Sequence, residues 1–315
     1  MKSIGSAAAS PKVGRGYLLG AIEASTNAGP WTVPDSYNKY NGVLRYSRGE
    51  ESVNGFSVTF MGYHGRWNAT EATPQRAIDA GFDRFGSIDP TDGGKTYRYS
   101  VGGEWQHSTG NVLSKVQAYG LGYRLNLISN FTFFLDDPVH GDQQEQVDRR
   151  FVTGVKAFQK RQGRWGRFTV MNTYGVQVRN DDVMQVALYH TEARVRLNAK
   201  SDASAMVTSV GGYVENQIEW ARWMRTTVGL REDGSRYGVT SMTDPRNSGN
   251  STAHITSPKA ALTVGPFKST EFYVNAGTGF HSNSALGTTL TRDAAGNPID
   301  PVTPLVRAKG AEIGF

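Results

Sequence analysis

The sequence predicts an all-β fold: an antiparallel transmembrane β-barrel, to which this chain contributes about twelve strands. Three observations predict it. Apolar and polar side chains alternate with a period of two, short and long connections alternate along the chain, and aromatic residues gather near the expected strand ends. No segment shows a comparably sustained helical period. The mean hydropathy of −0.46 fits such strands, because a lipid-facing and a wet face average to a polar value.

Composition narrows the class of protein. The chain has 315 residues, 38% of them hydrophobic, and this length suits one all-β unit or two ordinary domains. Its net charge of +6 is scattered, so no nucleic-acid partner is predicted. The absence of Cys excludes a disulfide scaffold and a thiolate metal site. No apolar stretch approaches the roughly 20 residues that a spanning helix requires.

The period of two assigns side chains to faces. In 95–107, Tyr97, Tyr99, Val101 and Trp105 share the face expected to meet lipid. The same alternation recurs in 167–179, 210–220 and 269–281. Segment 187–200 also alternates, which predicts one extended strand in a ribbon that projects beyond the membrane. The side chains predicted to face the lumen are Arg98, Glu104, Gln106, Glu215, Gln217, Glu219 and Asn275.

The connections alternate in length. Short polar turns are predicted within 47–52, 107–111, 160–166, 220–223 and 265–270, with hairpins at 108–110 and at Gly163. Long segments rich in Gly, Pro, Asn and Asp lie between them, at 26–41, 64–94, 129–146, 180–205, 231–254 and 281–304. Strict alternation places all short turns at one end of the sheet. Outer-membrane barrels are built this way, with short periplasmic turns and long extracellular loops.

Several segments resemble a known family. "GPFKSTEFYVNAGTGFHSN" (265–283) and "PLVRAKGAEIGF" (304–315) are similar to the barrel region of TonB-dependent outer-membrane receptors. The resemblance extends over residues 16–315, and residues 1–15 form a poorly defined N-terminal segment. In that family a separate domain plugs a barrel of roughly 22 strands. The resemblance therefore implies part of a barrel, lacking the plug and both barrel ends, which does not transport by itself.

The resemblance implies a transport function. The expected partners are outer-membrane lipid, a small-molecule or metal-chelate ligand such as an iron–siderophore complex, and the TonB energy-coupling protein, reached through a plug domain. The alternative is a soluble or surface all-β module that binds a glycan or protein without transport. Long-loop residues are the candidate ligand-binding groups because loops on a rigid scaffold carry binding sites. They are Trp31, Arg66, Trp67, Phe134, Asp136, His140, Arg231 and Asp233.

Catalytic and metal-binding patterns are not evident in the sequence. The six His residues are far apart, and none forms a pair at metal-ligand spacing. The Asp-rich stretches "DPTDGG" (89–94) and "DDPVHGD" (136–142) do not fit the 12-residue calcium loop, which favours a turn-making role. No nucleophile elbow or phosphate loop appears. We therefore predict a protein that is not an enzyme and has no cofactor.

Overall fold

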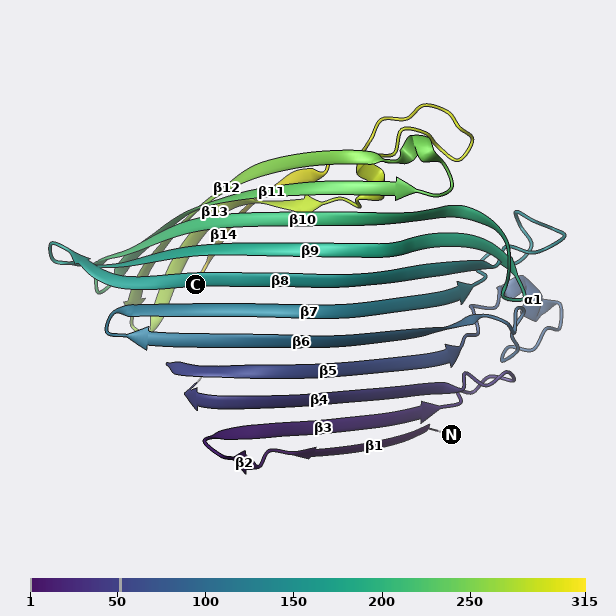
Figure 1. Cartoon of the computed structure of the whole chain (residues 1–315), viewed down its shortest axis with the longest axis horizontal. Coiled ribbons are helices and arrows are strands. Elements are labelled where there is room, and N and C mark those ends of the chain that lie inside the picture. Colours follow the sequence, from purple (N-terminus) through teal and green to yellow (C-terminus); the bar gives the residue numbers. More distant parts are fainter. Residues whose placement is uncertain (1, 51–52) are drawn as a thin grey trace.

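The computed structural model describes residues 2–50 and 53–315, and within them 14 strands form one antiparallel sheet (Figure 1). The strands pair in sequence order, except that β2 pairs beside β1 on β3. Among the described residues, β1 and β14 are the two edges and do not pair with each other. The elements are β1 (Lys2–Ala9), β2 (Lys12–Val13), β3 (Gly16–Asn27), β4 (Tyr37–Glu50), β5 (Asn54–Asn68), α1 (Gln75–Asp79), β6 (Gly93–Thr109), β7 (Val112–Ser129), β8 (Gln144–Trp165), β9 (Phe168–Glu192), β10 (Val195–Ala221), β11 (Met224–Ser241), η1 (Pro245–Asn247), β12 (Gly249–Phe267), β13 (Thr270–Ser282), η2 (Leu286–Thr288) and β14 (Leu305–Gly314).

The antiparallel meander predicted from the sequence is confirmed. The short turns after β6, β8, β10 and β12 lie at the left end of the sheet in Figure 1, and the long connections lie at the right, together with the two-residue turn between β9 and β10. The hairpin between β6 and β7 turns at Gly110, whose φ of 57° suits glycine. The prediction for Gly163 is wrong, because this residue lies within β8 opposite Val170. The chain turns instead at Gly166, which has a φ of 58°.

Two predicted long loops are mostly strand. Within 180–205, β9 and β10 form a hairpin that turns at Ala193 and Arg194, with φ values of 46° and 70°. Segment 187–200 is therefore not one extended strand. Within 231–254, β11 and β12 leave only 242–248 as a connection. Gly and Asn favour turns locally, but pairing with neighbouring strands on both sides decides the backbone conformation.

The N-terminal residues also join the sheet. Strand β1 pairs with β3 along its whole length, from Lys2 opposite Asn27 to Ala9 opposite Gly20. The sequence predicted no element in residues 1–15. The strand count therefore exceeds the expected twelve or so. No helix among the described residues is long and apolar enough to cross a membrane.

The sheet has one apolar and one polar face. The face that we call the outer face carries exposed apolar side chains, including Phe60 opposite Val101 and Val155 opposite Val178. The opposite, inner face carries most of the ionic side chains. The ladder register places on it all the residues that the sequence assigned to the lumen: Arg98, Glu104, Gln106, Glu215, Gln217, Glu219 and Asn275.

A small apolar core lies on the inner face at the long-loop end. Its buried members are Val183, Ala203, Ala205 and Val239, on β9, β10 and β11. Ala285 and Leu286 of the connection between β13 and β14 pack against it. This connection, residues 283–304, therefore folds over the inner face instead of extending away from the sheet. Its position fixes one wall of the cavity described next.

Candidate functional site at the long-loop end

A cavity of about 850 Å³ opens at the long-loop end of the sheet. It lies between the first part of β10, the connection 242–248 and the connection 283–304. Leu286 and Leu290 contribute apolar surface. The ionic residues that line it are Lys200, Asp202, Asp244, Arg246, Arg292 and Asp293.

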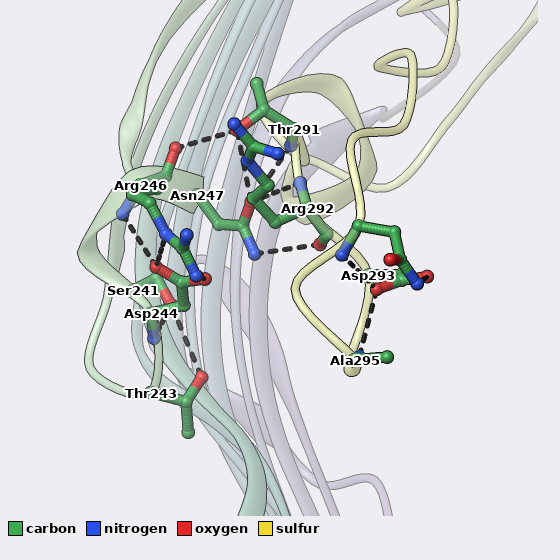
Figure 2. A network of polar contacts seen from close by, with 10 residues as sticks. Ser241, Thr243, Asp244, Arg246, Asn247, Thr291, Arg292, Asp293 and Ala295 are labelled. Carbon is green, nitrogen blue, oxygen red and sulfur yellow. Dashed lines mark hydrogen bonds and ion pairs between the residues drawn. The ribbon is translucent and has the colours of Figure 1, made fainter.

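Asn247 joins the two connections that form the cavity wall (Figure 2). Its Oδ1 accepts hydrogen bonds from the backbone N–H groups of Thr291 and Arg292, both at 2.9 Å. Its Nδ2 donates to the carbonyl oxygen of Arg292 at 3.1 Å. The Thr291 hydroxyl donates in turn to the carbonyl oxygen of Arg246 at 2.9 Å. These bonds hold Arg246 and Arg292 beside each other although they come from distant parts of the chain.

Asp244 positions the Arg246 guanidinium. Its carboxylate accepts from Nε and Nη2 of Arg246, at 2.9 and 2.8 Å, and from the Arg246 backbone N–H at 3.0 Å. These hydrogen bonds, together with the positive charges of Arg246 and Arg292, lower the pKa of Asp244. The Arg246 side chain remains 61% exposed. It therefore keeps accessible N–H donors for an anion, since a guanidinium has five.

The carboxylates of the other two acidic residues at the cavity accept hydrogen bonds from neighbouring groups of the protein. Asp293 accepts from the backbone N–H groups of Ala295 and Asn297, at 2.9 and 2.8 Å. Asp202 accepts from Gln185 at 3.1 Å and from the Tyr189 hydroxyl. In the part of the chain that the structure describes, no acidic group lies within ion-pairing distance of the Lys200 ammonium or the Arg292 guanidinium. The cavity lining thus holds equal numbers of cations and acids, and the groups available to an anionic ligand are Lys200, Arg292 and the exposed Arg246.

A second polar cluster fixes the neighbouring loops. Gln143 is almost fully buried, and its Nε2 donates to Asp89 at 3.0 Å and to Asp92 at 3.1 Å. Its Oε1 accepts from the Thr191 hydroxyl at 3.0 Å and from the Arg194 backbone N–H at 2.9 Å. These contacts tie the β5–β6 and β7–β8 connections to the β9–β10 turn. Burial, with the nearby negative charge of Asp89, raises the pKa of Asp92 to about 7.

Asp142 organises the connection between β7 and β8. Its carboxylate accepts from the backbone N–H groups of Leu135, Asp136 and Asp137, at 2.8 to 3.1 Å. Burial alone would raise its pKa, but these bonds and one from Thr132 outweigh it and lower the pKa to about 2. Both Asp-rich stretches therefore make turns, as the sequence predicted. Within the described residues, no group of three or more His, Asp or Glu side chains could hold a metal ion.

The predicted ligand-binding residues divide into two groups. Trp31 lies in the β3–β4 connection, and Phe134, Asp136 and His140 lie in the β7–β8 connection. The loop assignment is wrong for the others. Arg66 and Trp67 belong to β5, and Arg231 and Asp233 belong to β11. The predicted loops extended too far because their polar, Gly-containing sequence hid the ends of strands that pair on both sides.

The contacts of these residues differ as well. The Trp31 ring lies 6.2 Å from the Phe85 ring, and His140 Nδ1 is 3.1 Å from Glu192 Oε2. The Phe134 side chain is 56% exposed. Arg231 and Asp233 form an ion pair on the inner face at 2.5 Å. The structure thus does not gather the predicted set into one site.

Sequence reasoning identified both connections of the cavity but selected no residue in the part that lines it. A signal was available, because "DPRN" (244–247) combines an Asx–Pro turn with an Arg in the middle of a polar segment. The matching Arg292 lies in "LTRDAAGN" (290–297). Only the chain path brings the two together, and no local pattern records it.

An antiparallel meander with an apolar outer face, an ionic inner face and loops sorted by length defines an outer-membrane β-barrel region. The sequence profile of the family described as TonB dependent receptor-like, beta-barrel matches residues 27–315. The chain therefore belongs to this family, and it is an outer-membrane protein. No protein of curated function matches the sequence.

Solved structures show the same fold. The ferric citrate transporter FecA in its unliganded form aligns with a TM-score of 0.74 at 12% identity, over 89% of this chain and 41% of that one. The siderophore receptor PiuA from Acinetobacter baumannii aligns with a TM-score of 0.74 at 13% identity, over 99% and 52%. The ferric-catecholate import receptor Fiu from E. coli K12 aligns with a TM-score of 0.67 at 8% identity, over 89% and 49%. The chain thus spans about half the length of these proteins.

Proposed function

We propose that this chain forms the ligand-capturing side of a receptor that imports an anionic metal chelate across the outer membrane. Import is driven by the TonB protein acting through a plug domain, and no catalytic step is involved. The observation that carries the proposal is that the cavity at the long-loop end is lined by three cations, the exposed Arg246 and, without an acidic partner among the described residues, Lys200 and Arg292. Family membership and the names of the structural neighbours, which include ferric citrate and ferric-catecholate systems, support it.

The chemistry of capture follows from the side chains present. A guanidinium binds carboxylate or catecholate oxygens through paired N–H donors, and it stays charged at any physiological pH. Arg246 is held by Asp244 with donors still exposed, so binding requires little reordering. Leu286 and Leu290 offer apolar contact to the organic part of a chelate. The alternative of a soluble binding module is not favoured, because the family is one of outer-membrane receptors.

The test uses the receptor in cells that depend on it for iron. We expect Arg246→Gln combined with Arg292→Gln to raise the KM for uptake of ferric citrate or of a ferric catecholate by at least about tenfold, since two charge-assisted contacts are lost. The matched control is Arg222→Gln in the short turn between β10 and β11, at the opposite end of the sheet. An uncoupler of the proton gradient should stop uptake but not binding. Unchanged KM values for both chelates in the double variant would refute the cavity as the capture site.

A further inference from the structure

The outer face carries a group of cations near the long-loop end of β5 to β8. We call Arg66, Lys95, Arg124 and Arg149 the outer-face cation cluster. The ladder register sets Arg66 directly opposite Lys95 and Arg124 directly opposite Arg149. Alternation along β5 and β6 puts Arg66 on the face of Phe60, and Lys95 on the face of Val101. The four strands lie side by side in Figure 1.

These cations repel one another across the strands. Like charges directly opposite in an antiparallel ladder are destabilising. Among residues 2–50 and 53–315, no acidic side chain lies within ion-pairing distance of any of the four. Glu145, an acid on this face, already pairs with Arg196 at 2.5 Å and accepts from Asn126, while Lys95 interacts with it only at longer range. The Nε atom of Arg149 is buried and has no hydrogen-bond partner.

Aromatic residues on β6 indicate the depth of the cluster in the membrane. Trp105 and Tyr97 lie on the outer face of β6, eight residues apart, which is about 27 Å along a strand. With the usual tilt of roughly 40°, this span corresponds to about 21 Å of height, close to the apolar band of about 25 Å in outer-membrane barrels. Lys95 is the next outer-face residue beyond Tyr97. The Arg124 guanidinium lies 5.5 Å from the Tyr97 ring centre. The cluster therefore stands at the level of the outer-leaflet headgroups.

We propose that the outer-face cation cluster binds the phosphate groups of a phosphorylated glycolipid of the outer leaflet. Arginine matches phosphate through paired N–H donors, and Lys95 adds a point charge beside Arg66. The adjacent apolar outer face receives the acyl chains of the same molecule, which a soluble anion lacks. Binding removes the repulsion between Arg66 and Lys95 and between Arg124 and Arg149. This interaction is separate from ligand capture, because it lies on the opposite face of the sheet from the cavity.

The experiment measures lipid bound to the receptor purified from outer membranes in mild detergent. The probes are a bisphosphorylated lipid A, the same lipid A after removal of its phosphates, and inorganic pyrophosphate. The test variant is Arg66→Gln with Arg124→Gln. The control is Arg48→Gln with Arg161→Gln, which removes the same charge from the outer face of β4 and β8 at the short-turn end.

We expect the test variant to bind bisphosphorylated lipid A at least about tenfold more weakly than the wild type, with the control unchanged. Dephosphorylated lipid A should bind all three proteins equally and weakly. Equal affinity of test and control variants would overturn the proposal, as would pyrophosphate binding as tightly as lipid A. If the test variant fails to fold, judged by its migration without heating on a gel, Arg66→Lys with Arg124→Lys keeps the charge and should retain most of the binding. Loss of lipid binding in that folded variant too would place the effect in shape rather than charge and would also overturn the proposal.

Discussion

The two faces of the sheet differ in how their charged side chains are paired. On the inner face, many cations of the strands have acidic partners close by in the sheet. Across the sheet, the pairs are Glu23 with Lys39, Glu104 with Lys115, Asp148 with Arg150, Asp181 with Arg179, Glu215 with Lys259, Asp233 with Arg231 and Glu271 with Arg225. In the outer-face cation cluster, cations stand opposite cations.

This difference indicates where the counterions of each face come from. A polar lumen can be filled by water or by protein, and self-paired charges suit both because they bring little net charge. The outer face meets lipid, so its band of apolar side chains excludes charge at the midplane. In the cluster beyond Tyr97, no acidic side chain of the described residues lies within ion-pairing distance, so the counterion has to come from outside the chain.

The assignment of the two faces can be tested by placing a charge at the membrane midplane on each face, and this test has the largest expected effect. Val101→Arg in the folded receptor should lower the free energy of unfolding in bilayers by about 2 to 4 kcal/mol, because the outer face meets hydrocarbon at this depth. Ser100→Arg is the matched control, since Ser100 is the adjacent residue on the inner face. Ser100 is partly exposed, whereas an Arg at a buried inner-face position such as Gln106, with 8% exposure, would add a packing cost to the effect of charge. Urea titration of receptor in vesicles measures both, and equal losses would show that the faces are reversed.

The face assignment could be made from the sequence, whereas the site could not. Along 95–107 every second residue changes character, and a strand in a barrel must follow that alternation because one face meets lipid and the other does not. The extent of β9 to β12 escaped prediction, since Gly, Asn and Asp occur inside strands that are paired on both sides. The contact between Thr291 and Arg246 joins residues 45 positions apart and depends on how the connection 283–304 folds back. No local pattern encodes that path.

The inner-face pairs can be tested one partner at a time. Asp233 is buried and accepts from Nε and Nη2 of Arg231 at 2.6 and 2.5 Å. Asp233→Ala leaves the Arg231 charge without this partner, and we expect a loss of about 1 to 3 kcal/mol in the free energy of unfolding. Arg231→Ala in the same chain should restore part of it. A double-mutant cycle measures the coupling.

The control for that cycle is the pair of Arg225 with Glu271, whose side chains are 43% and 41% exposed. Glu271→Ala should cost less than about 1 kcal/mol, and added salt should reduce that cost further. If Asp233→Ala were no more damaging than Glu271→Ala, pairing on the inner face would be a matter of solubility rather than stability.

The smallest expected effect is the pH dependence of loop stability caused by Asp92, a carboxyl group that has no cationic partner within the described part of the chain and does not face lipid. Asp92 is fully buried in the loops and is contacted by neutral donors, the Gln143 amide at 3.1 Å and the Asn130 backbone N–H at 3.0 Å. Burial raises its pKa to about 7, above the ordinary Asp value near 3.8. The folded loops therefore hold a proton that the opened loops release, and their stability decreases as the pH rises from about 4 to about 7 and then stays constant.

Hydrogen exchange of the backbone amides in 130–143 measures this local stability. We expect protection to fall between pH 5 and pH 8 in the wild type, after correction for the intrinsic exchange rate. In Asp92→Asn the slope should disappear, because the amide cannot ionise, although one hydrogen bond to Asn130 is lost. Asp142→Asn is the control. Its folded pKa of about 2 lies below this range, so the substitution weakens the loop but should leave the slope in place. A slope that survives in Asp92→Asn would assign the pH dependence to another group and leave Asp92 ionised in the folded loops.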